Sequence, residues 1–273
     1  MPALPEAARR ENFPVASRLL PPATRDAVHA FYRFARAADD VADHPELSTE
    51  GKLALLHDFA RGLSDGVEGA PAEALALREV LARHGMKPVQ PLLLLQAFRQ
   101  DAVQNRLQSW SDLMLYCRYS AAPVGRFLLE LHGAPAAATR PADALCIALQ
   151  LINHLQDCGE DYRRLDRVYL PREWFEAEGA QMAELDGRVA GRALARVFAR
   201  MVERIDQLLA EARPLPGLLP DRRFRLEAAV ILSLAQALAA LLRHADPLAG
   251  RPRLGRLPKA LAVMRGLWRG LFA

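Results

Sequence analysis

Two acidic clusters far apart in the chain each lie in a stretch whose apolar residues recur at helical spacing. Their sequences are DDVAD at 39–43 and DCGED at 157–161. In each cluster the first and last aspartates stand four residues apart, which places both carboxylates on one face of a helix. Two such faces opposed across a helical bundle concentrate negative charge in an apolar interior, where unpaired carboxylates are costly. We therefore expect a helical bundle in which cations neutralise the two faces.

The composition favours helices over sheets. Hydrophobic residues make up 51% of the 273 residues, and aromatic residues only 7%. Leu, Ala and Arg are abundant, whereas the β-branched and aromatic residues typical of strands are comparatively scarce. A chain of this length can bury a sizeable core. We predict a single all-α domain spanning residues 1–273.

The apolar spacing predicts helices over most of the chain and no strands. The expected helices cover 22–41, 53–63, 72–84, 88–103, 109–133, 141–164, 187–212, 223–243 and 257–272. Pro45 should end the first helix, and the proline-rich stretch 214–220 should form a turn. The most apolar run, 228–242, is too short to span a bilayer, and we expect it to be a buried core helix.

Charge and cysteine content exclude several classes of protein. The net charge is only +4 and the basic residues are spread out, so we expect no nucleic-acid partner. The three cysteines show no metal-ligand spacing, and their odd number argues against a disulfide framework. The N-terminus lacks the apolar run of a secretory signal. These features favour a cytoplasmic protein.

Basic and apolar residues are mixed at helical spacing in the last stretch, 257–272. One interpretation is a basic amphipathic helix that rests on the inner face of the cytoplasmic membrane or guides an oily substrate. The other is a terminal helix that packs on the bundle. The pattern by itself leaves both open.

The two acidic clusters have the chemistry of a magnesium and diphosphate site. Magnesium prefers oxygen ligands and usually binds through one or two carboxylates together with phosphate oxygens of a substrate. The candidate ligands are the outer aspartates of the clusters: Asp39, Asp43, Asp157 and Asp161. Bound cations neutralise the charge that develops when a carbon–oxygen bond to diphosphate ionises. We therefore expect a site that ionises a diphosphate ester.

Two amide side chains extend the second acidic line. Gln150, Asn153, Asp157 and Asp161 stand at i, i+3, i+7 and i+11 of an otherwise apolar helix, so they share one face. Polar groups on such a face need partners inside the protein. Metal, water and phosphate oxygen would satisfy all four.

Arginines and aromatic residues complete the expected site. Arg36 and Arg167 flank the clusters and could hold diphosphate oxygens through paired hydrogen bonds; the alternative for each is a structural ion pair. Departure of diphosphate leaves a carbocation, which needs an apolar cavity with electron-rich groups nearby. The candidates for this role are aromatic: Phe13, Tyr32, Tyr119 and Tyr169. His154 has no His or Cys co-ligand beside it, so we expect it to pack structurally.

Four strings of residues resemble the squalene/phytoene synthase family. They are YRFARAADDVAD at 32–43, YCRYS at 116–120, QLIN at 150–153 with DCGED at 157–161, and RVYLP at 167–171. The resemblance implies a single isoprenoid-synthase-type bundle with a central cavity, and magnesium-dependent chemistry on prenyl diphosphates.

The resemblance also assigns roles to individual residues. The implied magnesium and diphosphate ligands are Asp39, Asp43, Asn153, Asp157 and Asp161. Arg36 and Arg167 would assist them. The residues implied to line the reacting carbons are Tyr32, Tyr119, Gln150 and Tyr169.

Finer features are similar to one branch of the family, the bacterial hydroxysqualene synthases of hopanoid biosynthesis. These features are ENFPVAS at 11–17, YCRYSAAPVGR at 116–126, and Gln156 before the second cluster. Many phytoene and squalene synthases have Arg in place of Gln156 and Gly in place of Ala122. The branch resemblance implies a lyase. Presqualene diphosphate ionises, its cyclopropyl cation rearranges, and water captures the product as hydroxysqualene.

Two alternatives stay open. One is a transferase that joins two prenyl diphosphates head to head into presqualene diphosphate or phytoene with the same metal helices. The other is a non-catalytic relative that acts in assembly, which would be expected to lose the motif aspartates that this chain keeps. Other enzymes of the squalene pathway are the protein partners that the resemblance suggests.

Overall fold

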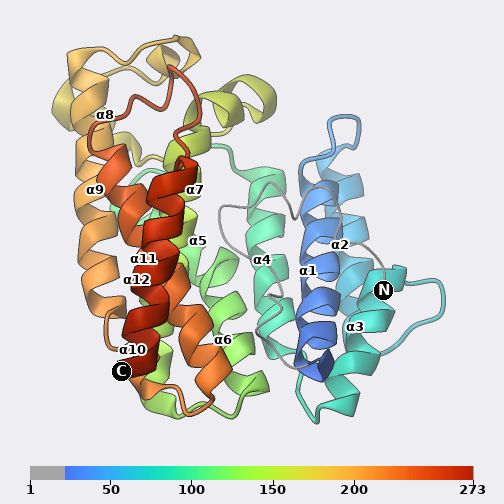
Figure 1. Ribbon diagram of the computed structural model, residues 1–273. Helices are drawn as coiled ribbons and strands as arrows, with labels where there is room; N and C mark the ends of the chain where they lie inside the picture. Colours follow the sequence, from blue (N-terminus) through green and yellow to red (C-terminus); the bar gives the residue numbers. More distant parts are fainter. Residues whose placement is uncertain (1–21, 273) are drawn as a thin grey trace.

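The computed structural model describes residues 22–272, and helices supply the regular secondary structure of this part of the chain (Figure 1). In chain order the α-helices are α1 (Pro22–Ala42), α2 (Thr49–Ser64), α3 (Ala72–Arg83), α4 (Val89–Val103), α5 (Trp110–Ser120), α6 (Ala122–Leu131), α7 (Thr139–Leu165), α8 (Arg172–Glu178), α9 (Arg192–Ala212), α10 (Leu215–Leu218), α11 (Arg222–Leu242) and α12 (Arg256–Phe272). Within 22–272 no strand forms, and an isolated β-bridge joins Arg106 to Val168. The predicted all-α fold class is confirmed.

Polar residues at helix starts explain where several of these helices begin. Ser48 accepts a hydrogen bond from a first-turn N–H of α2, and Asp221 does the same for α11. Ser109 and Asp112 form a reciprocal capping pair at the start of α5. Such caps satisfy N–H groups that have no partner within the helix.

The predicted helix over 109–133 is in fact two helices, α5 and α6, with a break at Ala121. The backbone of Ala121 leaves the regular helical conformation, with φ −123° and ψ −49°. Pro123 stands in the first turn of α6, where it has no N–H to donate to the carbonyl of Tyr119. A proline that the sequence already displays is therefore the reason for the break.

Other differences from the predicted helices lie at their ends. The helix expected over 187–212 begins only at Arg192, and the expected turn over 214–220 contains the short helix α10. Helix α8 follows Pro171, in a stretch that the expected helices did not include. A proline before or within a first helical turn is compatible with a helix, because its missing N–H would have no partner there.

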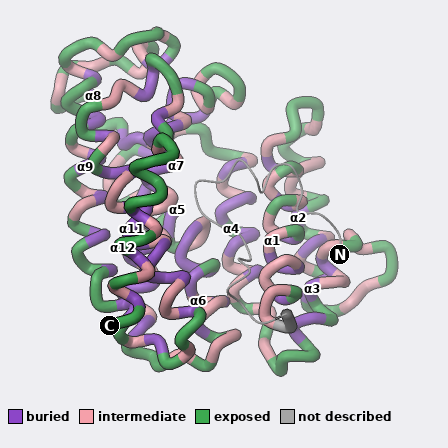
Figure 2. Tube along the Cα trace, in the orientation of Figure 1, coloured by how far each residue is buried: buried purple, intermediate pink, exposed green. Residues whose placement is uncertain are grey.

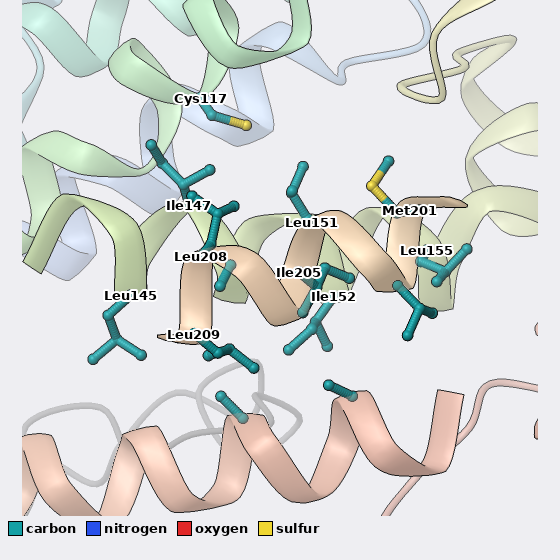
Figure 3. Packing of buried hydrophobic residues seen from close by; sticks show 14 of the residues in the cluster. Cys117, Leu145, Ile147, Leu151, Ile152, Leu155, Met201, Ile205, Leu208 and Leu209 are labelled. Atoms are coloured by element: carbon teal, nitrogen blue, oxygen red, sulfur yellow. The ribbon is translucent and has the colours of Figure 1, made fainter. Parts of the chain in front are cut away.

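Buried apolar residues form two main groups. The larger lies around α7 and α9, where Leu151 and Ile152 of α7 pack with Ile205 and Leu208 of α9 (Figure 3). The smaller lies among α1 to α4 and contains the fully buried Phe34. In Figure 1, α1 to α3 lie on one side, α7, α9, α11 and α12 on the other, and α4 to α6 between them. The two acidic clusters thus come from helices that belong to different halves of the core.

Among residues 22–272, one helix has the length and apolar composition expected of a membrane span, and this helix is α11. It has 21 residues, so it extends beyond the apolar run 228–242 on which the expectation of a core helix was based. Most of its apolar window is buried inside the protein. Leu232, Ala235 and Leu238 belong to the larger core group, as expected of a core helix.

Candidate functional site

The first acidic cluster lies at the carboxyl end of α1. Asp39 belongs to the helix, whereas Asp43 follows the last helical residue, Ala42. The N–H of Asp43 still donates to the carbonyl of Asp39 at 2.9 Å, so the helical turn continues and the two side chains share a face. Both side chains are about one third exposed. Arg36, one turn earlier, pairs with Asp39 at 3.3 Å and with Asp40 at 2.8 Å.

The second cluster lies near the carboxyl end of α7. Its polar line is visible in the pattern of burial, because the four predicted positions are partly exposed while the leucines and isoleucines between them are buried. These positions are Gln150, Asn153, Asp157 and Asp161. The sequence periodicity of α7 thus identified the face that its polar side chains share.

Arg167 connects the two clusters. After α7, Asp166 takes a left-handed backbone conformation, with φ 49°, and its carboxylate and carbonyl oxygens both accept from Arg106. This turn brings Arg167 back toward α1, where its Nη1 lies 2.8 Å from Oδ1 of Asp43. The side chain of Arg167 is only 7% exposed, and its Nη2 donates to the carbonyl of Asp101 at 3.1 Å. One guanidinium therefore joins α1, α4 and the segment after α7.

A buried carboxylate on α4, Asp101, anchors the aromatic part of the site. Its Oδ2 accepts from the hydroxyl of Tyr116 at 2.8 Å, and its Oδ1 accepts from the hydroxyl of Tyr169 at 3.1 Å. The ring of Tyr169 stacks on His154, with centroids 3.7 Å apart. His154 is within 3.2 Å of the amide of Gln150 and packs structurally in this network.

Sequence reasoning missed Asp101 and Tyr116. A signal for Asp101 was present, because it shares an apolar face of α4 with Leu94 and Phe98 at i, i+4 and i+7. The same argument that singled out the polar line of α7 applies to this position. Tyr116 was visible in the YCRYS string, but its hydroxyl could be placed only by the partner from α4.

The segment before α12 packs on α7 and contributes a third missed residue, Arg251. Its guanidinium binds both carboxylate oxygens of Asp157, with Nη2 2.9 Å from Oδ2. The neighbouring Gln156 is buried and donates to the carbonyl of Pro252. Gln156 therefore fixes this segment instead of lying on the polar line. Nothing in the basic string around Arg251 distinguishes it from an exposed loop.

Burial and the charges of neighbouring carboxylates raise the pKa values of three carboxyl groups in the site. Burial, together with the charge of Asp43, raises the pKa of Asp39 to about 7. Burial and the charge of Asp157 raise the pKa of Asp161 to about 8, and Asp43 on the opposite helix adds to the effect. Burial raises the pKa of Asp101 to about 6, although Arg167 and the two tyrosines lower it. The carboxylates of α1 and α7 thus lie close enough to repel one another.

Protonation of His154 is disfavoured in this surrounding. Burial, reinforced by Arg167, lowers the pKa of His154 to about 3. The ring is therefore neutral at physiological pH and stacks on Tyr169 as an uncharged aromatic group.

The donor atoms offered by α1 and α7 suit a hard cation. Among residues 22–272, no three His, Cys, Asp or Glu side chains gather around one point as a complete metal site. Helices α1 and α7 instead each bring two carboxylates to the site, with Arg167 or Arg251 as counter-charge, and the pKa values of Asp39 and Asp161 are raised. Magnesium is commonly held by one or two carboxylates while a substrate phosphate supplies further oxygens, so these residues fit such an ion.

The remaining predicted residues lie around this centre or outside the described part. Tyr32 lies on α1, seven residues before Asp39 and partly buried. Tyr119 lies on α5, three residues after Tyr116, and packs against the larger core group. Phe13 lies outside the described residues. The structure therefore brings together the outer aspartates, Arg167, Tyr169 and Gln150, and adds Asp101, Tyr116 and Arg251 to them.

Comparison with known proteins gives consistent results. The profile of the squalene/phytoene synthase family matches residues 7–258. The chain is 44% identical over 246 residues to a hydroxysqualene synthase of Rhodopseudomonas palustris, covering 90% of this chain and 84% of that protein. A hydroxysqualene synthase of Zymomonas mobilis is 43% identical over 243 residues, covering 88% of this chain and 82% of that protein. Among solved structures, the squalene synthase HpnC from Alicyclobacillus acidocaldarius superposes with a TM-score of 0.71 at 31% identity, covering 84% of this chain and 86% of that chain.

Proposed function

The chain belongs to the squalene/phytoene synthase family, and on that premise we propose that it converts presqualene diphosphate and water to hydroxysqualene and diphosphate. The relatives named hydroxysqualene synthase cover most of this chain at 42–44% identity, which supports this reaction. The enzyme would then be a carbon–oxygen lyase that acts on a diphosphate. We place it in the cytoplasm, with the squalene-pathway enzymes that supply its substrate and use its product as candidate partners.

The observation that carries the proposal is the pair of acidic helix faces with arginines between them. Asp39 and Asp43 approach from α1, and Asp157 and Asp161 from α7. We propose that these residues, with Asn153, hold magnesium, whose chemistry is to neutralise the oxygens of the departing diphosphate. A centre of this kind is suited to ionising an allylic or cyclopropylcarbinyl diphosphate.

The arginines can hold the diphosphate itself. Arg167 and Arg251 each bind a carboxylate of the site, and both guanidiniums present planar paired donors that suit phosphate oxygens. When a cation neutralises Asp43 or Asp157, the corresponding arginine becomes free to bind the diphosphate. Arg36, which is half exposed beside Asp39, would approach the same oxygens from the solvent side.

The aromatic network is suited to hold the reacting carbons. Tyr169 is fixed by the hydroxyl contact to Asp101 and by its stack on His154, so its ring and oxygen have one position. A fixed electron-rich ring can stabilise a nearby carbocation. We propose that Tyr169, with Tyr32, Tyr119 and Gln150, lines the hydrocarbon part of the site, and that Asp101 and Tyr116 hold Tyr169 in place.

Product analysis tests the reaction. The full chain is incubated with magnesium and either presqualene diphosphate or farnesyl diphosphate, and the organic products are identified by mass spectrometry. We expect hydroxysqualene and free diphosphate from presqualene diphosphate, and no product from farnesyl diphosphate alone. Turnover of farnesyl diphosphate but not of presqualene diphosphate would assign the transferase reaction instead. Turnover of neither, together with no magnesium-dependent binding of diphosphate, would indicate the non-catalytic alternative.

A further inference from the structure

The outward face of α12 carries a stripe of exposed apolar side chains. Its members, which we call the α12 stripe, are Leu257, Leu261, Met264, Trp268, Leu271 and Phe272. Their spacing of three and four residues places them along one side of the helix. They are six of the twelve large hydrophobic residues that are exposed within 22–272, so exposed apolar side chains are concentrated on this helix. Figure 2 shows the exposed positions along α12 in green. Trp268 is 67% exposed and Phe272 72%.

Packing of α12 on the bundle uses a different face. The buried positions are Ala262, Gly266 and Gly270, which let α12 lie directly against α11. A methyl group added at Gly266 would stand 2.5 Å from the Cα of Val230. The interpretation of this stretch as a terminal helix that packs on the bundle is confirmed for one face, whereas membrane contact through the outward α12 stripe stays a prediction.

Positive charge surrounds the stripe. From residue 251 to the end the chain contains five arginines and one lysine, and no acidic residue. Arg251 binds Asp157, whereas Arg265 and Arg269 lie on α12 next to the stripe. Together with Arg213 they line a surface hollow of about 650 Å³ whose apolar wall includes Trp268 and Phe272. Burial and the charges of Arg265 and Arg213 lower the pKa of Arg269, which shows that the three guanidiniums lie close together.

We infer that the α12 stripe docks on the surface of an anionic phospholipid bilayer, with the hollow of Arg213, Arg265 and Arg269 taking a lipid phosphate. Indole and aliphatic side chains enter the boundary between head groups and acyl chains, while guanidiniums bind the head groups. This inference goes beyond the proposed reaction and does not depend on it.

The charges disfavour the other occupants of such a surface. A second copy of the chain, paired through the same stripe, would bring two sets of cations together without an acidic residue from either helix. A nucleic acid would leave the six apolar side chains without a partner. An anionic bilayer satisfies both the charge and the apolar stripe.

Docking can be measured separately from catalysis. The hollow lies at the end of the molecule that holds α10 and the carboxyl end of α12, whereas the acidic end of α7 lies near α8 at the opposite end (Figure 1). Binding to vesicles therefore needs no substrate. Turnover of presqualene diphosphate in detergent micelles reports on the site of α1 and α7 without a bilayer.

The test is co-sedimentation of the full chain with vesicles of phosphatidylcholine alone or of phosphatidylcholine and phosphatidylglycerol in equal parts. We expect binding only to the anionic vesicles, and release at high salt. Trp268 should report insertion through a blue shift of fluorescence that the Trp268→Phe variant lacks. The triple variant Arg213→Gln, Arg265→Gln, Arg269→Gln should partition on the order of 100-fold more weakly, since each basic residue near an anionic surface contributes roughly a fivefold effect.

A control variant removes the same charge elsewhere. Arg83, Arg188 and Arg192 are exposed and do not line the hollow, so their replacement by Gln should leave vesicle binding nearly unchanged. The triple variant Arg213→Gln, Arg265→Gln, Arg269→Gln should keep wild-type turnover in micelles. Equal vesicle binding by the wild type and this variant would overturn the inference, as would absence of binding by the wild type. Self-association abolished by Trp268→Ser with Phe272→Ser would assign the stripe to a second copy instead.

Discussion

In the metal-free protein, the guanidinium of Arg167 supplies positive charge to both acidic clusters. Its guanidinium is 7% exposed and contacts Asp43, the hydroxyl of Tyr169 and the backbone of Asp101. The nearby carboxylates raise its pKa despite its burial. It is therefore charged at every accessible pH, and its loss would leave buried carboxylates without a counter-charge.

Arg167→Ala should lower the free energy of unfolding by about 3–5 kcal/mol, because removing one partner of a buried ion pair leaves the other uncompensated. The loss should be smaller at acidic pH, since the pKa of Asp101 is raised to about 6 and its carboxylate can then take a proton. Urea unfolding at acidic and alkaline pH measures both effects. Arg164→Ala is the control, because Arg164 is 73% exposed and pairs with Glu160 one turn away, so its loss should cost less than about 1 kcal/mol. Equal losses for the two variants would contradict the role given to Arg167.

Asp39→Asn and Asp157→Asn should each lower kcat by orders of magnitude while the fold stays intact, because a charged ligand is lost with little change in packing. The matched control is Asp40→Asn, since Asp40 belongs to the same cluster but its side chain is 59% exposed and turned to Arg36. Turnover is measured with presqualene diphosphate, and folding by circular dichroism. Retained activity in both variants would refute the assignment of these aspartates.

Helix α12 has two faces of different composition. Its small residues allow close contact with α11, and its large residues face outward. Gly266 is needed for this contact, since a Cβ there would stand 2.5 Å from the Cα of Val230 and 2.8 Å from the carbonyl oxygen of Ala229. Backbone atoms cannot move aside as a flexible side chain could.

Gly266→Ala should therefore lower the free energy of unfolding by about 1–3 kcal/mol through overpacking. Gly51→Ala on α2 is the control, because a Cβ there meets its nearest atom at an ordinary 3.6 Å. That control should be neutral or stabilising, since Ala favours a helix over Gly by up to about 1 kcal/mol. Thermal unfolding of both variants distinguishes them, and an unchanged midpoint for Gly266→Ala would show that α12 can shift away from α11.

At the scale of the whole molecule, the two halves of the core meet where the carboxylates near the carboxyl ends of α1 and α7 repel one another. The pKa of Asp39 is raised to about 7 and that of Asp161 to about 8, so the folded, metal-free protein holds protons there that the unfolded chain releases at lower pH. Stability from these groups is present at acidic pH and is lost as pH rises through about 7 to 8. A bound cation removes the repulsion and the need for these protons.

Magnesium should therefore raise the unfolding temperature more at about pH 8 than at about pH 6, where Asp39 and Asp161 are largely protonated. Thermal unfolding with and without magnesium at the two pH values measures this. The variant with both Asp39→Asn and Asp161→Asn should lose the difference. An equal effect of magnesium at both pH values would show that these carboxylates do not bind it.

The family and the all-α class could be predicted from the sequence because both rest on local patterns. Helical periodicity determines which residues of one helix share a face, so the polar line from Gln150 to Asp161 was predictable before any fold was known. The position of Pro123 could also have predicted the break between α5 and α6.

Which faces meet was decided only by the tertiary structure. Asp157 and Arg251 are 94 residues apart, and Asp43 and Arg167 are 124 apart, so no local pattern relates them. The apolar face of α4, which carries Asp101, packs beside α5 and the segment after α7. The Asp101 carboxylate can therefore accept hydrogen bonds from both Tyr116 and Tyr169. The sequence by itself therefore determined the carboxylates, the amides and the helices that carry them. The side chains that hold these groups in one charged, partly buried centre depend on how distant helices pack, which local periodicity does not encode.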